Sequence, residues 1–311
     1  MKPVPTMDNS AQDHAERVSQ WWATDRSKGM HSWLQHPIVR STINRRVTGD
    51  PDIPAVVWFR NRFVPQPVGL CLALGCGHGV FDRYAVELGI ARHVHAIDIS
   101  EGAIESARRT AEEAGLAAHI EYEVGDINKL EFSASTYDLV VAMSSIHHVS
   151  ELEKLFAQCA RTLKPGGLLF MDEYVGPSRF QTPPELRVLI DGLLKTLPEH
   201  YRRNLFTNDG TTRDEYLPPT VEQMIALDPS EAVRSAEIMS VLRGHFEVVE
   251  HKPYGGGIQH QLFSGIMGNF DPENEEDVAL LKAISDLEVS LESLGAVPSD
   301  FAAIVARPLS H

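Results

Sequence analysis

A glycine-rich turn between an apolar run and a helical pattern constrains the fold of this chain most. Residues 70–74 (Leu-Cys-Leu-Ala-Leu) are apolar and short, which is typical of a buried parallel strand. Gly75, Gly77 and Gly79 follow at once, and from residue 80 to residue 88 apolar side chains recur at helical spacing. A strand, a glycine turn and a helix start together bring backbone N–H groups close to an anionic ligand group.

The spacing of the glycines limits which ligands the turn is expected to bind. Dinucleotide-binding proteins carry Gly-x-Gly-x-x-Gly, whereas this turn reads Gly-x-Gly-x-Gly and has Val80 where a third glycine is expected. The spacing therefore disfavours an NAD(P)-dependent oxidoreductase, which stays an alternative from a different enzyme class.

Strand and helix patterns alternate after the turn. Strands are expected at residues 70–74, 93–98, 119–124, 137–143 and 168–172, and helices at residues 80–88, 100–114 and 150–163. Ser100 is predicted to cap the second helix, and Ser150 and Glu153 are predicted to form a capping box on the third. Residues 164–167 (Lys-Pro-Gly-Gly) are predicted to end that helix. Repeated units of this length predict an α/β fold with a doubly wound parallel sheet.

The same patterns divide the chain into four parts. They are an N-terminal helical lid (1–64), a ligand-binding core (65–176), a helical cap insertion (177–243), and a last part (244–311) with two more strands and a further helical insertion at 254–298. A helical stretch at residues 14–46 carries Trp21, Trp22 and Trp33. These rings either pack the helices onto the core or shield a bound ligand from water.

Composition and net charge limit the classes of molecule that the chain is expected to bind. The 311 residues include 28 Lys and Arg against 43 Asp and Glu, a formal net charge of −15. Such a chain repels phosphate groups, so nucleic acid and anionic membranes are not expected partners. The three cysteines have neither metal-site nor disulfide spacing, and neither a signal peptide nor an apolar run of about 18 residues is found. We therefore expect a cytoplasmic protein without a bound metal; the oligomeric state is not predicted.

Four features in this order resemble the class I S-adenosylmethionine-dependent methyltransferases. They are residues 74–79 (Leu-Gly-Cys-Gly-His-Gly), Asp98 at the end of the second strand, Gly125-Asp126 after the third, and residues 163–167 (Leu-Lys-Pro-Gly-Gly) before the fifth. The resemblance covers about residues 68–175 and, more loosely, the last two strands. It implies a Rossmann-like seven-stranded sheet whose last strand is antiparallel, with S-adenosyl-L-methionine as the cofactor.

The resemblance also implies which residues hold the cofactor. The glycine turn would lie against the methionine moiety, Asp98 would bind the ribose, Asp126 would bind the adenine amino group, and Ile127 would pack on the ring. The full set implied in this way is Gly75, Cys76, Gly77, Gly79, Asp98, Ile99, Asp126, Ile127 and Met143.

One position departs from the family pattern. The strand before the glycines usually carries an acidic residue that helps to hold the ammonium group of the cofactor, and here that position is Ala73. Water or another carboxylate replaces it in the first interpretation. In the second, the ammonium loses a neighbouring charge, its pKa falls, and the amine attacks the activated carbon of the same molecule. That reaction resembles the azetidine-2-carboxylate synthases, cyclases or lyases of this fold that release methylthioadenosine.

Two side chains are candidate catalytic groups. His147 follows the fourth strand, where it would take a proton from an acceptor hydroxyl, although the His147-His148 pair is equally typical of a structural role. Tyr174 ends the fifth strand, where its ring would face the sulfonium or simply pack. The leading hypothesis is methyl transfer to a small-molecule acceptor held under the cap. Cyclisation or lysis of the cofactor is the alternative, ahead of an oxidoreductase or a non-catalytic binding protein.

Overall fold

A seven-stranded mixed sheet forms the centre of the molecule in the computed structural model, which describes residues 32–207 and 209–309. The strands are β1 (Val68–Leu74), β2 (Ala91–Asp98), β3 (Ile120–Val124), β4 (Tyr137–Met143), β5 (Leu163–Tyr174), β6 (Phe246–Gly255) and β7 (Phe301–Pro308). Their order is β3-β2-β1-β4-β5-β7-β6, and β7 runs antiparallel to both β5 and β6. The expected doubly wound α/β fold with an antiparallel last strand is confirmed.

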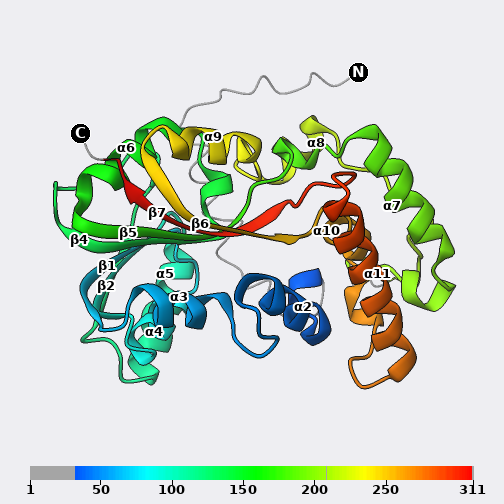
Figure 1. The fold of residues 1–311 in the computed structure, drawn as a ribbon, viewed down its shortest axis with the longest axis horizontal. Helices are drawn as coiled ribbons and strands as arrows, with labels where there is room; N and C mark the ends of the chain where they lie inside the picture. The colour runs from blue at the N-terminus through cyan, green and yellow to red at the C-terminus, as the bar shows by residue number, and fades with distance from the viewer. Residues whose placement is uncertain (1–31, 208, 310–311) are drawn as a thin grey trace, which may run out of the picture.

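Helices cover both faces of this sheet (Figure 1). On one side lie α3 (Ala55–Phe63), α4 (Val80–Glu87) and α5 (Glu101–Glu113), and on the other lie α6 (Leu152–Thr162) and α9 (Ile238–Arg243). Ser100 caps α5 as predicted, because its Oγ accepts a hydrogen bond from the N–H of Ala103. The Phe59 ring of α3 stacks on Phe170 of β5 at a centroid distance of 4.2 Å. This contact fixes the N-terminal segment to the sheet.

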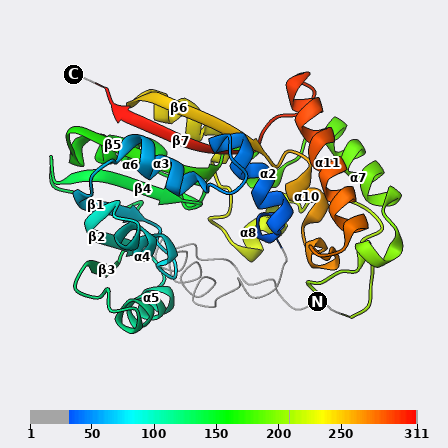
Figure 2. The ribbon, with the colours of Figure 1, turned by 60° about the horizontal axis from the view of Figure 1, so that its bottom comes forward.

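A second group of helices gathers at one end of the sheet (Figures 1 and 2). It contains α2 (Pro37–Thr48), α7 (Pro184–Thr196), α10 (Gln259–Phe263) and α11 (Glu275–Ser293). Shorter elements complete the fold: α8 (Val221–Leu227), η1 (Trp33–Gln35), η2 (Ile146–His148), η3 (Ser178–Phe180), η4 (Glu199–Arg202), η5 (Ser235–Glu237) and η6 (Met267–Asn269). Helix α2 contacts both α11 and β6, so segments from the two ends of the chain pack together.

Trp33 has a packing role in this arrangement. It is buried, and its ring lies 5.4 Å from that of Phe301 in β7. Trp21 and Trp22 lie outside the described residues, and the division of the chain into lid, core and cap stays a prediction. No helix within residues 32–207 and 209–309 combines the length and the apolar character needed to cross a bilayer.

Two expected helices are broken in the structure. The described part of the stretch at 14–46 is a short η1 turn followed by α2, which starts at Pro37 because proline is favoured at the first helical position. Within the cap insertion 177–243, the pattern over residues 221–243 also predicts one continuous helix, but α8 ends at Leu227 and the chain continues as η5 and then α9. Pro229 explains the break, since the residue before a proline is disfavoured in helical conformation.

The predicted capping box on α6 is wrong. The N-cap residue is Glu151, and it makes no side-chain capping bond. The Oγ of Ser150 instead donates to Oδ1 of Asn128 at 3.2 Å, and Glu153 pairs with Arg234 at 2.7 Å. The helix ends at Thr162, one residue before its predicted end at residue 163, and residues 163–167 already belong to β5, which is longer than predicted.

Candidate functional site

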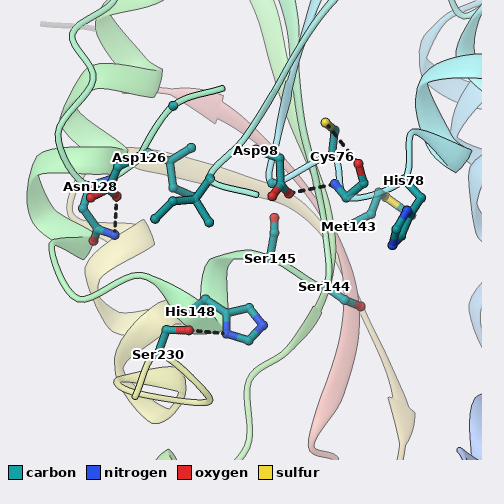
Figure 3. A pocket seen from close by; sticks show the side chains of 15 residues that line it. Cys76, His78, Asp98, Asp126, Asn128, Met143, Ser144, Ser145, His148 and Ser230 are labelled. Atoms are coloured by element: carbon teal, nitrogen blue, oxygen red, sulfur yellow. Dashed lines mark hydrogen bonds between the residues drawn. The ribbon is translucent and has the colours of Figure 1, made fainter. Parts of the chain in front are cut away.

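A pocket of about 270 Å³ lies at the carboxyl ends of β1, β2, β3 and β4. It is lined by Gly75, Cys76, Gly77, His78, Asp98, Ile99, Gly125, Asp126, Ile127, Asn128, Met143, Ser144, Ser145, His148 and Ser230. In Figure 3, Asp126 and Asn128 lie at one end of the pocket and His78 at the other, with Asp98 between them. Ligands bind at this edge of the sheet in doubly wound α/β folds.

The glycine turn is held against the loop that follows β4. Gly75 has a φ of +62°, and a Cβ at this position would lie 2.5 Å from the Cβ of Ser145. The Oγ of Ser145 donates a hydrogen bond of 2.7 Å to the carbonyl oxygen of Leu74. A glycine is therefore required for the two loops to approach, and together they form one wall of the pocket.

Asp98 ends β2 in the middle of the pocket. Its Oδ2 accepts a hydrogen bond from the N–H of Gly77, and its Oδ1 accepts one from the N–H of Ser100, both at 2.8 Å. Burial raises the pKa of this carboxyl, while the two backbone N–H groups oppose the shift. Each carboxylate oxygen has a further lone pair, so the ionised group suits a ligand that offers two neighbouring hydroxyls.

Asp126 and Ile127 form the opposite end. The Oδ1 of Asp126 accepts hydrogen bonds of 3.0 Å from the N–H and the Nδ2 of Asn128, and Lys129 lies 3.0 Å from Oδ2. Burial would raise the pKa of Asp126, but the bonds from Lys129 and Asn128 outweigh it and lower the pKa. An ionised acceptor beside an apolar side chain suits a flat ring that carries an amino group.

The loop after β4 is organised by Glu173, a fully buried residue of β5. Its Oε2 accepts hydrogen bonds from the N–H of Ser145 at 2.9 Å and of Ile146 at 2.7 Å. Its Oε1 lies 2.5 Å from the Nδ1 of His147. Burial alone would lower the pKa of His147, but Glu173, Glu231 and Asp228 raise it to about 9. His147 is therefore a buried imidazolium at neutral pH.

Neither predicted catalytic side chain lines the pocket. His147 lies behind the wall, paired with Glu173. The Tyr174 hydroxyl donates to the carbonyl oxygen of Pro177 at 2.9 Å, and its ring packs edge-on against Phe180 and Phe301. Both side chains thus have structural partners, and the geometry supports the structural interpretation of each.

His148 faces the pocket in place of His147. Its Nδ1 lies 3.1 Å from the Oγ of Ser230, which in turn donates to Oδ1 of Asp228 at 2.6 Å (Figure 3). Burial and the neighbouring imidazolium of His147 hold the pKa of His148 well below its usual range. The ring is therefore neutral at pH 7.

His147, His148 and Glu231 also have the composition of a metal site, with one ligand atom of each within 4.8 Å of the others. We interpret the group as an ion-pair network, because the charged ring of His147 lies between Glu173 and Glu231, with its Nε2 3.5 Å from Glu231.

All the predicted cofactor-binding residues except Gly79 line the pocket. Gly79 has a φ of +70°, and a Cβ there would lie 2.5 Å from the Tyr122 hydroxyl and 2.9 Å from the Cβ of Ala107. This glycine is required where α4 passes α5, so the structure gives it a packing role instead.

Sequence reasoning missed several lining residues: His78, Asn128, Ser144, Ser145, His148 and Ser230. Five of these six residues lie within the predicted motifs or within two positions of a predicted site residue, so their place in the sequence could have identified them as candidates. Ser230 comes from the segment between β5 and β6, and no local pattern points to it.

Comparison with known proteins agrees with this geometry. Residues 72–171 match the family model described as a methyltransferase domain. The ubiquinone biosynthesis O-methyltransferase of Methylocella silvestris is 35% identical over 164 residues, which cover 50% of this chain and 59% of that protein. The protein of the same name from Coxiella burnetii is 31% identical, over 36% of this chain and 47% of its own length. The chain thus spans only about half of the curated relatives it matches.

One solved structure shares the fold over most of the chain. The geranyl diphosphate C-methyltransferase from Streptomyces coelicolor superposes with a TM-score of 0.56 at 15% identity, covering 96% of this chain and all of the other. That structure contains S-adenosyl-L-homocysteine. Over residues 72–171, the chain is therefore similar to known methyltransferase domains, in agreement with the resemblance to the class I S-adenosylmethionine-dependent methyltransferases.

Proposed function

We propose that the chain binds S-adenosyl-L-methionine in the pocket and transfers its methyl group to a small-molecule acceptor. The observation that carries the proposal is the convergence of Asp98, Asp126 and the glycine turn, at the carboxyl ends of three different strands, on one pocket. An acceptor for a ribose diol, an acceptor for an adenine amino group and a close backbone turn match the three parts of this cofactor. The residues present therefore fit the cofactor.

The bound cofactor would supply a methyl group on a positively charged sulfur. The chain's own contribution is to hold an acceptor in line with that group and to exclude water. Ser230 belongs to the segment between β5 and β6 and lines the same pocket as the glycine turn. A pocket bordered by this segment favours a small-molecule acceptor, and the net charge of −15 disfavours nucleic acid and anionic membranes.

An acceptor oxygen is the finer proposal. The relatives that match at 31–35% identity are named O-methyltransferases. His148 is neutral and lies at the pocket, so it is able to accept the proton that a hydroxyl loses on methylation. We also propose a reducing compartment such as the cytoplasm, because Cys71, Cys76 and Cys159 are free thiols.

Two measurements test the proposal. S-adenosylhomocysteine should raise the melting temperature, whereas NAD and NADP should leave it unchanged. Incubation with labelled S-adenosylmethionine and a panel of phenols should then give a methylated product together with S-adenosylhomocysteine. A rise with the nicotinamide cofactors alone would contradict the cofactor assignment. Release of methylthioadenosine in the absence of any acceptor would instead support the cyclisation hypothesis, which gains no support from the matches above.

A further inference from the structure

Asp82 is a buried carboxylate that makes no hydrogen bond within the described part of the chain. It lies in the first turn of α4 and is 0% exposed. Neither of its oxygens has a hydrogen-bond partner among the residues that the structure describes. The neighbouring guanidinium of Arg83 donates instead to the carbonyl oxygen of His78, at 2.9 Å. A buried carboxylate in this state is costly unless it takes up a proton or meets a cation.

The carboxylate lines a cavity of about 150 Å³ beneath the glycine turn. The lining consists of Ala73, Leu74, Gly75, Cys76, Val80, Phe81, Asp82, Val141 and Met143. Asp82 is the one charged side chain among these described residues. Gly75, Cys76 and Met143 also line the main pocket, so the two cavities adjoin at the turn.

The position of the cavity indicates what enters it. Adenosine would occupy the main pocket between Asp126 and Asp98, and the part of the cofactor beyond the ribose would then reach the glycine turn. That part is an amino acid chain, which ends in an ammonium and a carboxylate. The cavity past the turn offers one anion in apolar surroundings, and this arrangement suits the ammonium. The N–H groups of the first turn of α4, which lack intrahelical partners, suit the carboxylate.

We propose that this cavity binds the α-ammonium group of S-adenosylmethionine and that Asp82 is its counter-ion, an inference that rests on the proposed function. Ala73 lines the same cavity. A carboxylate from α4 thus takes the place of the one that β1 lacks. The premise of the cyclisation hypothesis, an ammonium without a neighbouring negative charge, then no longer holds, because the carboxylate favours the charged form.

Calorimetric titration with paired ligands tests the proposal. S-adenosylhomocysteine contains the amino acid chain, whereas methylthioadenosine has the adenosine and the sulfur without it. Asp82→Asn should weaken the binding of S-adenosylhomocysteine by roughly 10- to 100-fold, the range for a charge-assisted hydrogen bond. Methylthioadenosine should bind both proteins within about twofold. Glu87→Gln is the matched control, because Glu87 is an exposed carboxylate of the same helix.

Different results would contradict the role of Asp82 and the proposed function. Unchanged affinity of Asp82→Asn for S-adenosylhomocysteine, or an equal loss for both ligands, would overturn the role of Asp82. Failure of the wild-type protein to bind either ligand would overturn the proposed function instead.

A measurement on the wild-type protein covers the case in which the variant does not fold. S-adenosylhomocysteine is compared with its analogue that carries hydrogen in place of the amino group. The analogue should bind at least about tenfold more weakly. Equal binding of the two would overturn the proposal.

Discussion

Glu173 and His147 form a buried ion pair behind the wall of the candidate site, with Oε1 of Glu173 2.5 Å from Nδ1 of His147. The same carboxylate accepts hydrogen bonds from the N–H groups of Ser145 and Ile146. One side chain of β5 therefore fixes the conformation of the loop after β4, and this loop supplies Ser144, Ser145 and His148 to the pocket.

Glu173→Gln should destabilise the protein by about 3–5 kcal/mol, because it leaves the imidazolium of His147 buried without its main counter-ion. Chemical denaturation measures the change. Glu153→Gln is the control, because Glu153 pairs with Arg234 at the exposed surface, and it should change the stability little. A loss no larger than that of the control would show that the buried pair does not fix the loop.

The same pair predicts a pH dependence of stability. The folded pKa of His147, raised to about 9, lies above the unfolded value of about 6.5. Its contribution to stability is therefore fully present below pH 6.5 and is lost as the pH rises through about 9. The difference in unfolding free energy between the wild type and Glu173→Gln should be widest below pH 6.5 and should narrow above pH 9. A difference that stays constant over this range would contradict the assigned charge of His147.

Asp98→Asn should weaken the binding of adenosine and of S-adenosylhomocysteine by about tenfold or more, because the amide replaces an ionised acceptor. Adenine should bind as before, since the ribose is the part that Asp98 is proposed to hold. Calorimetry with the three ligands measures the effect, and Glu101→Gln is the control, an exposed carboxylate in the first turn of α5. Equal losses for adenine and adenosine would mean that the ribose lies elsewhere.

His148→Gln should lower kcat for a hydroxyl acceptor by about 100-fold, in the usual range for loss of a general base. The affinity for S-adenosylhomocysteine should stay within about threefold. Turnover of the variant should recover as the pH rises toward the pKa of the acceptor, because hydroxide then removes the proton. His93→Gln, an exposed histidine of β2, is the control. A parallel loss of cofactor affinity would indicate that His148 shapes the pocket instead.

Much of the core was predictable because its signals are local. Glycine spacing predicts the turn after β1, and a carboxylate that follows an apolar run, as Asp98 does, predicts a side chain at the edge of the sheet. The capping box at Ser150 failed for a different reason. The hydroxyl of Ser150 forms a hydrogen bond with Asn128, which is distant in the sequence, and does not cap the helix. The spacing of residues in a motif does not reveal such tertiary contacts.

The orientations of the two adjacent histidines could not be predicted from the local sequence. His147 and His148 are adjacent in sequence, yet one lies behind the wall and the other faces the pocket. The orientation of His147 is fixed by its contact with Glu173, 26 residues later in the sequence, and that of His148 by its contact with Ser230, 82 residues later. Ser230 reaches the pocket only through the packing of the segment between β5 and β6.

Asp82→Asn should stabilise the protein without ligand at pH 8. Burial raises the pKa of Asp82 to about 7, with Arg83 opposing the shift and Asp98 adding to it. The charge of Asp82 in turn helps to raise the pKa of the Cys71 and Cys76 thiols and of the Tyr122 hydroxyl. Between the unfolded pKa of about 4 and pH 7, the folded state holds the extra proton, so wild-type stability from this group falls as the pH rises. The variant does not share this loss.

The variant should therefore gain on the order of 1–4 kcal/mol over the wild type at pH 8, and almost nothing at pH 4. Denaturation at both pH values measures the gain. Saturating S-adenosylhomocysteine should reduce this gain at pH 8 by about 1.4–2.8 kcal/mol, the equivalent of a 10- to 100-fold difference in affinity, because its ammonium stabilises the wild-type carboxylate and not the amide. A variant that is less stable than the wild type at pH 8 without ligand would assign Asp82 a structural role. A carboxylate that destabilises the free protein and becomes favourable only when a ligand binds is typical of a binding residue.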